Sequence, residues 1–135
     1  NVTNATTLNN TLKVTGATTV SNTLKVTSAA TFAAVDATSF NASSDYRIKE
    51  NVVPISDTSY NIDKLRPVIY TNTKAEKQDF GVIAHELQQQ LPFLVSGEKD
   101  GENYQSVNYN GLIGLLLNEV QQLKKRVQEL EQSKP

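Results

Sequence analysis

The chain has 135 residues with 13 basic and 14 acidic side chains, a formal net charge of −1, and no Cys, Met or Trp. This balance argues against a protein that binds nucleic acid or a membrane surface, because both functions need clustered basic charge. The lack of cysteine excludes a disulfide scaffold, a thiolate zinc site and a cysteine nucleophile. The hydrophobic content of 38% is low for a small chain that completes its core alone, so assembly with partner chains is plausible.

The sequence also contains no apolar run long enough for a membrane span. It does not begin with Met, which suggests a fragment of something longer.

Residues 1–40 differ in composition from the rest, with three charged side chains but eleven Thr, seven Ala and five Asn. VTNATTLNNTLK at residues 2–13 and VTGATTVSNTLK at residues 14–25 agree at nine of twelve positions. Their apolar residues recur at even spacings, which place them on one face of a strand: Val2, Leu8 and Leu12, then Val14, Val20 and Leu24. Since so thin a unit cannot bury this face alone, we predict a repetitive β-stalk that stacks on neighbouring repeats or chains. A disordered Thr/Asn-rich linker is the alternative.

Residues 41–110 read as a small α+β domain. We predict strands at residues 46–53 and 65–70, the second irregular or at an edge because it contains Pro67. A short strand at residues 80–83 leads into a helix at residues 84–91, which Pro92 ends. A polar turn at residues 97–103 and a strand at residues 104–107 complete the domain.

Residues 111–135 show the most regular periodicity and predict an oligomerising helix. Apolar residues at a and d positions repeat over three heptads: Ile113, Leu116, Val120, Leu123, Val127 and Leu130. Charges of opposite sign occupy the flanking g and e positions of a parallel seam, in the pairs Glu119–Lys124 and Arg126–Glu131. β-Branched residues at a with Leu at d favour two strands. A single helix that packs on its own domain is the alternative reading.

Five blocks in the second part of the chain carry a family resemblance. They are SDYRIKEN at residues 44–51, LRPVIY at 65–70, DFGVIAHEL at 79–87, LPFLVS at 91–96, and residues 107–117 leading into the Leu/Val helix. Together they resemble the C-terminal intramolecular chaperone domain of the self-cleaving endosialidase-type peptidase family, which ends phage tailspikes, tail fibres and neck appendages. The resemblance extends from residue 41 to about residue 130. It implies a homotrimer that folds the preceding fibre or spike polypeptide, with residues 1–40 as the end of an intertwined trimeric β-stalk.

The resemblance also assigns a catalytic pair, Ser44 and Lys49. A serine hydroxyl needs a base to become a good nucleophile, and lysine serves as that base only where burial lowers its pKa. By family pattern the cleaved bond joins Ser44 to Asp45. An N-to-O acyl shift would instead cut between Ser43 and Ser44, and the sequence leaves both bonds open.

Two further residues are candidates for support of this chemistry. Asn51, or backbone amides, would stabilise the oxyanion, as the family position suggests. Glu50 would orient Lys49 or pair with Arg47 rather than act as an acid. The single histidine, His85, and the scattered acidic residues lack metal-ligand spacing, so we expect neither a metal nor a cofactor.

The favoured function is therefore an intramolecular chaperone that trimerises a viral fibre stalk and then releases itself by a single autoproteolytic turnover. We expect a virion tail or appendage precursor that assembles in the host cytoplasm, with no nucleic-acid or membrane partner. One alternative is a trimerisation cap of an adhesin or fibre that never cuts. A Ser/Lys protease that acts on other proteins is the least favoured, because no substrate cleft or specificity element is visible.

Overall fold

The computed structural model describes residues 11–133 and divides the chain into two units, Asn1–Ser44 and Asp45–Pro135. Residues 11–44 form no helix or strand as a single chain, and every one of their side chains is exposed. The predicted β-stalk therefore stays a prediction, and Val2 and Leu8 of its first repeat lie outside the described residues. A strand whose partners belong to other chains has nothing to pair with here.

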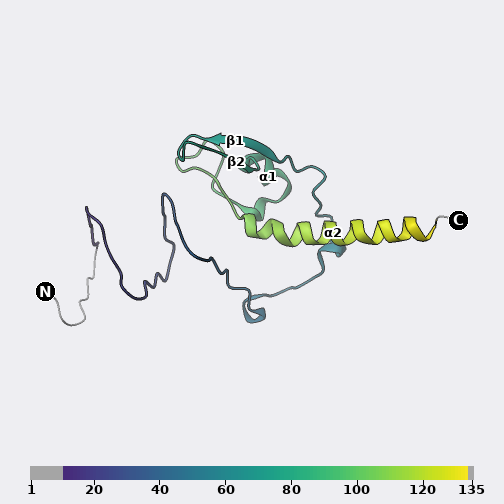
Figure 1. Cartoon of the computed structure of the whole chain (residues 1–135), viewed down its shortest axis with the longest axis horizontal. Coiled ribbons are helices and arrows are strands. Elements are labelled where there is room, and N and C mark those ends of the chain that lie inside the picture. The colour runs from purple at the N-terminus through teal and green to yellow at the C-terminus, as the bar shows by residue number, and fades with distance from the viewer. Residues whose placement is uncertain (1–10, 134–135) are drawn as a thin grey trace. The chain divides into compact units, whose positions relative to one another are not determined.

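The second unit is a small α+β domain that continues into a long helix (Figure 1). Its fold class agrees with the α+β prediction for this part of the chain. The elements follow in this order: η1 (Tyr46–Ile48), η2 (Ile55–Asp57), β1 (Val68–Asn72), β2 (Lys77–Gly81), α1 (Ala84–Gln90), η3 (Pro92–Leu94), β3 (Val95–Ser96), β4 (Ser106–Val107) and α2 (Tyr109–Gln132).

The strand predicted at residues 46–53 is wrong. Its first residues form the single 3₁₀ turn η1, and the backbone N–H of Lys49 closes this turn by donating to the Tyr46 carbonyl at 3.1 Å. Asp45 is the N-cap, and its side chain accepts a hydrogen bond from the Arg47 N–H. A local side-chain cap of this kind satisfies backbone groups that a strand would leave for a neighbour, which explains the difference.

β1 and β2 form an antiparallel hairpin that pairs Val68 with Gly81 and Asn72 with Lys77. The strand predicted at residues 65–70 begins only after Pro67, which has no N–H to donate to a ladder. Asn72 shapes the turn, because its Oδ1 accepts hydrogen bonds from the backbone N–H groups of Lys74 and Ala75, at 3.0 and 3.1 Å.

The helix predicted at residues 84–91 is confirmed as α1, which ends at Gln90 just before Pro92. After η3, the two-residue strands β3 and β4 pair antiparallel across the polar turn. Gly97 begins this turn with φ 86°, a left-handed backbone conformation that glycine adopts without a steric cost. These short elements bring the chain back to the start of α2.

The core of the second unit lies where α1, η3 and the first turns of α2 meet. Its buried side chains are Leu87, Leu91, Leu94 and Leu115. Asn108 anchors the start of α2 twice: its N–H donates to the Leu94 carbonyl at 2.8 Å, and its side chain caps the helix by accepting from Gly111. A methyl group at Gly111 would overlap the buried Leu94 side chain, so α2 packs at a distance that only glycine permits.

We predict that Gly111→Ala lowers the free energy of unfolding by about 1–3 kcal/mol, because the new methyl group must displace Leu94 from the core. Gly114→Ala is the matched control on the same helix. A Cβ there meets only the end of Ile55, at 3.6 Å, so the better helix propensity of alanine should add roughly 0.5–1 kcal/mol. Urea unfolding measures both variants, and equal stability would contradict the close packing at Gly111.

Candidate functional site

The residues around the predicted catalytic pair are exposed in the single chain. Ser44 ends the first unit, whereas Lys49 belongs to the second unit and terminates η1 with extended backbone angles. The pairing of the Ser44 hydroxyl with the Lys49 amine, and the bond that is cut, remain predictions. Asp45 and Lys49 stand at the two ends of one 3₁₀ turn, so the structure does bring these two residues into one short segment.

Asp45 and Arg47 form a clamp at the start of this segment. The Asp45 Oδ1 accepts from the Arg47 backbone N–H and from Nε, both at 2.9 Å, while Oδ2 accepts from Nη2 at 2.9 Å. Hydrogen bonds from the Arg47 side chain, and then from its backbone, hold the pKa of the Asp45 carboxyl below its usual value. The carboxylate therefore stays ionised and committed to Arg47 except at low pH.

Sequence analysis missed this clamp, although a signal for it was present. An Asp two residues before an Arg, with no β-branched residue between them, is a combination that an N-cap can use. In the single chain Arg47 pairs with Asp45. The supporting roles of Glu50 stay predictions. The shorter Asp side chain also reaches the backbone N–H, which gives it an extra hydrogen bond that Glu50 does not make.

Glu50 and Asn51 follow directly, and both are exposed. Asn51 has φ 53°, in the left-handed region that asparagine tolerates better than most residues. The chain therefore changes direction immediately after the predicted base. The role of Asn51 in stabilising an oxyanion stays a prediction. Its left-handed backbone angle also favours asparagine at this position over most other residues.

α2 has two apolar faces with different surroundings. Leu115 is 4% exposed and Leu112 is half-buried against the core, so one face of the first turns belongs to the domain. The six residues of the predicted seam lie on a different face and are between 49% and 61% exposed: Ile113, Leu116, Val120, Leu123, Val127 and Leu130. Beyond Val120 every described residue of α2 is exposed, and Figure 1 shows this part of the helix extending away from the domain.

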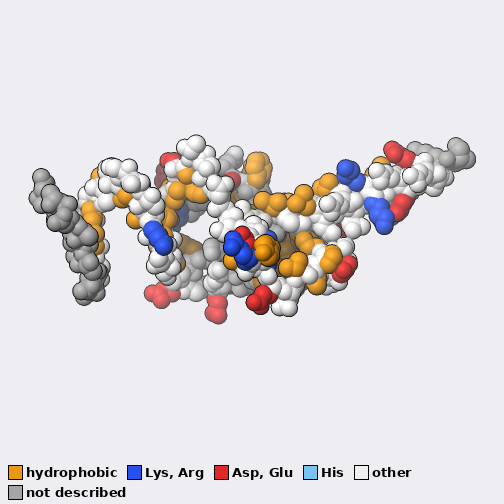
Figure 2. All heavy atoms as spheres, turned by 90° about the horizontal axis from the view of Figure 1, so that it is seen from below, with side chains coloured by type: hydrophobic (Ala, Val, Ile, Leu, Met, Phe, Trp, Pro, Cys, Tyr) orange, Lys and Arg blue, Asp and Glu red, His pale blue; other side chains and the backbone are white. Residues whose placement is uncertain are grey.

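Figure 2 shows hydrophobic side chains gathered over the folded part of the second unit and along the adjoining part of α2, with charged side chains nearer the helix end. Leu117, at the e position beside the seam, is 59% exposed and widens the apolar stripe near the domain. A helix with one stripe on its core and another in water has a surface to offer a second chain.

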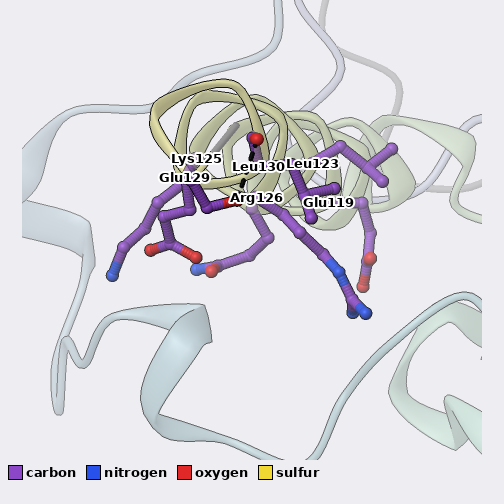
Figure 3. A pocket seen from close by; sticks show the side chains of 8 residues that line it. Glu119, Leu123, Lys125, Arg126, Glu129 and Leu130 are labelled. Atoms are coloured by element: carbon purple, nitrogen blue, oxygen red, sulfur yellow. Dashed lines mark hydrogen bonds between the residues drawn. The ribbon is translucent and has the colours of Figure 1, made fainter. Parts of the chain in front are cut away.

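Charged side chains flank the distal part of the seam. Figure 3 shows Glu119, Arg126 and Glu129 on the same side of α2 as Leu123 and Leu130. Residues of α2 and its C-cap Ser133 line this shallow surface, so it is a helix face rather than an enclosed cavity. The final turn closes locally, with the Ser133 Oγ donating to the Leu130 carbonyl at 2.9 Å. Of these residues, Glu119 and Arg126 occupy g positions, where charges beside an apolar stripe are typical of a coiled coil.

Within residues 11–133 no group of three or more His, Asp or Glu side chains is arranged to hold a metal ion. Across the same part of the chain, no helix is long and apolar enough to cross a membrane.

Comparison with known proteins identifies the same region. Residues 44–96 match the family model described as chaperone of endosialidase, Peptidase_S74. The long tail fiber protein Gp37 of Escherichia phage AR1 is 35% identical over 80 residues, which cover 53% of this chain and 7% of that protein. Gp37 of Enterobacteria phage K3 and Gp37 of Enterobacteria phage T2 are each 32% identical to this chain over 108 residues. The aligned region covers 75% of this chain, 9% of the K3 protein and 8% of the T2 protein. No solved structure matches significantly.

The chain thus spans less than a tenth of the length of these tail fibre proteins.

We predict that Arg47→Gln raises the pKa of the Asp45 carboxyl towards its usual value, because the guanidinium that favours the charged form is lost. Carbon-13 NMR titration of the Asp carboxyl groups measures this change. The matched control is Arg66→Gln, which removes the other bidentate pair, Arg66 with Glu86, and should raise the pKa of Glu86 alone. An Asp45 titration that is the same in wild type and Arg47→Gln would contradict the clamp.

Proposed function

From the premise that this chain belongs, through residues 44–96, to the endosialidase-type chaperone family, we propose that it trimerises and folds the stalk of a phage tail fibre and then cuts itself free. The chaperone role and the link to tail fibres rest on the family match and on the Gp37 relatives. The observation that carries the assembly part of the proposal is the seam of α2, an ordered apolar surface that the other described residues of the second unit leave about half exposed.

The seam supports self-association through both its apolar and its charged residues. Fully burying a Val, Leu or Ile side chain contributes about 1.5–3 kcal/mol, and the seam offers six such side chains that are about half exposed. In a parallel, in-register alignment Glu119 meets Lys124 and Arg126 meets Glu131 across the seam. Identical chains therefore complement one another when their helices run the same way, which also aligns the stalks that precede them.

The seam pattern and the family point to different numbers of chains. β-Branched residues at a and Leu at d favour a dimer. The broader stripe created by the exposed Leu117 favours a bundle of more than two helices, because a third helix covers positions beside a and d. The family resemblance implies three chains. We therefore propose the trimer, and the mass of the assembly decides between the two numbers.

The client is the polypeptide that precedes the domain, including the repeats of residues 1–40. The described part of this segment has no helix or strand as a single chain, and its Val and Leu positions recur with the parity of one strand face. Interchain β-pairing is slow and exposes strand edges to aggregation. Helices that associate downstream raise the local concentration of the stalk chains and set their register before the strands pair.

Self-cleavage requires that assembly changes the surroundings of Lys49. The residue is exposed in the single chain. Burial against neighbouring chains would favour the neutral amine, which can then take the proton from the Ser44 hydroxyl. Cleavage would thus await assembly, and a chain that fails to assemble would keep its chaperone.

The chemistry has two balanced stages. The Ser44 oxygen attacks a carbonyl carbon while Lys49 takes the hydroxyl proton; the carbon–nitrogen bond then breaks as the proton passes to the departing nitrogen. Water hydrolyses the resulting ester and restores the hydroxyl. Backbone amides, or the Asn51 side chain, would stabilise the negative oxygen that forms in each stage.

The two candidate bonds demand different geometries. Attack on the carbonyl of Ser43, the preceding residue, forms a five-membered ring and cuts before Ser44. Attack on the carbonyl of Ser44 by its own hydroxyl needs a strained four-membered ring, so cleavage between Ser44 and Asp45 is better served by the hydroxyl of another copy. A trimer supplies such copies at high effective concentration.

We predict that wild type gives fragments of 44 and 91 residues on a denaturing gel if the bond after Ser44 is cut, whereas Ser44→Ala stays intact. Lys49→Arg should also stay intact, since arginine keeps the positive charge but cannot act as a base near neutral pH. Lys64→Arg, at another exposed lysine, is the control and should be cut normally. Mass spectrometry of the N-terminal fragment identifies the bond.

An intact, trimeric wild type would instead support the non-cleaving cap, and cleavage of Lys49→Arg would remove Lys49 from the mechanism.

The seam can be tested separately in the uncleaved Ser44→Ala protein. We expect the double variant Val120→Glu/Leu123→Glu to sediment as a monomer of 14.8 kDa, because charged residues replace the centre of the apolar stripe. Both positions are exposed in the single chain, so near-ultraviolet circular dichroism should show that the core remains folded.

The control Gln121→Glu/Gln128→Glu adds the same charge at b positions and should keep the mass of the parent, about 44 kDa for a trimer and about 30 kDa for a dimer. An assembled seam variant would contradict the role of α2.

A further inference from the structure

The first heptad of α2 differs from the other two at the positions beside the seam. In a parallel coiled coil, a g residue of one helix faces the e residue of the following heptad in its neighbour. Two of these pairs carry opposite charges: Glu119 with Lys124, and Arg126 with Glu131. The pair that precedes them is Leu112 with Leu117, so an apolar contact replaces an ion pair at one end of the seam.

The apolar pair lies in the part of α2 that contacts the domain. Leu112 is half-buried and packs against the leucine core, whereas Leu117 is 59% exposed. From Val120 onward every described residue of the helix is exposed. The two leucines therefore stand beside the domain, and the charged pairs lie mostly beyond it.

The charges select the direction of a neighbouring helix. In an antiparallel alignment of the same seam, g positions face g positions and e positions face e positions. The Glu119 side chains of two copies would then face each other, as would the Lys124 side chains, and Leu112 would face Arg126. Like charges that meet across an interface suppress an alignment. A second copy of this chain in parallel register instead matches each of these positions with a complementary side chain.

We propose, on the basis of the assembly proposed above, that Leu117 of each copy docks on Leu112 at the edge of the neighbouring copy's domain. Leu112 connects this contact to the interior, because it also packs against the buried leucines of its own domain. The hydrophobic core of each domain thus continues across the interface into the next helix. The neighbour stabilises the domain as well as the helix bundle.

This contact ties the stability of the domain to assembly. Among the described residues, the core of the second unit has only four buried side chains, which is few for a domain of this size. Burial of a further leucine at its edge is therefore a substantial addition. A chain that does not assemble lacks this addition, and its domain unfolds more readily than the domain of an assembled chain.

The contact is tested by crosslinking in the uncleaved Ser44→Ala protein, because the chain has no cysteine of its own. Chains with Leu112→Cys and chains with Leu117→Cys carry different tags, are coexpressed, and are treated with a short bismaleimide. We expect a covalent pair that contains both tags. Gln121→Cys, at an outward b position, is the matched control for Leu117→Cys and should give about a tenth as much product with Leu112→Cys.

A second measurement follows the assembly itself. Leu117→Ala should raise about tenfold the concentration at which half of the chains are assembled, because a leucine leaves the interface. Gln121→Ala is the control and should change this concentration by less than about twofold. In a Leu112→Ala background, Leu117→Ala should have a further effect of less than about threefold, because its partner is already gone.

A product with Gln121→Cys as abundant as the product with Leu117→Cys would overturn the proposal. So would an assembly concentration that Leu117→Ala leaves unchanged. Arg126→Cys probes the antiparallel alignment, and a dominant product between it and Leu112→Cys would also overturn the proposal. If the Ser44→Ala protein sediments as a monomer of 14.8 kDa at every concentration, the proposed assembly itself is wrong, which is a distinct result.

Discussion

The structure depends most on the contact between the first turns of α2 and the small leucine core. Leu115 is buried there against Leu94, and Gly111 lets the helix approach closely. Because this contact fixes the rotation of α2 about its own axis, it decides which face is covered and which is left in water. The domain takes the Leu112 and Leu115 side, and the regular stripe of Val, Ile and Leu is left exposed. Without this contact the helix would be free to turn its seam onto its own domain.

The same arrangement explains how folding and chemistry can be ordered in time. A single chain exposes its seam, its stalk repeats and its predicted base, so none of the three has the environment that its proposed function needs. In the proposed order of events, association of the helices comes first, since the seam is already ordered in one chain. After removal of the chaperone, an unfolded stalk could not refold. The lifetime of the folded stalk would then depend on its unfolding rate.

The segment after Ser44 shows how neighbouring charges can fix a local turn of the chain. Asp45 and Arg47 lie two residues apart at the start of η1. This short spacing lets their side chains form an ion pair with each other. An exposed ion pair of this kind contributes little to stability by itself. Its observed effect is local, because Asp45 also caps the 3₁₀ turn η1.

Several features of this protein are determined by the sequence alone. The three heptads predicted an amphipathic helix, because the spacing of apolar residues can be read from the sequence without knowing what the helix contacts. Pro92 marked the end of α1, because proline lacks the N–H that a helix needs as a hydrogen-bond donor. The five blocks identified the family. Local patterns also pointed to a strand at residues 46–53, where apolar residues suggested pairing but a side-chain cap formed a 3₁₀ turn.

Only the tertiary structure decided which apolar face of α2 belongs to the core, because Leu112 and Ile113 are equally apolar and differ only in what lies opposite them. It also decided that Arg47 binds Asp45 in the single chain, since a choice between two nearby carboxylates depends on backbone angles that residue order does not specify.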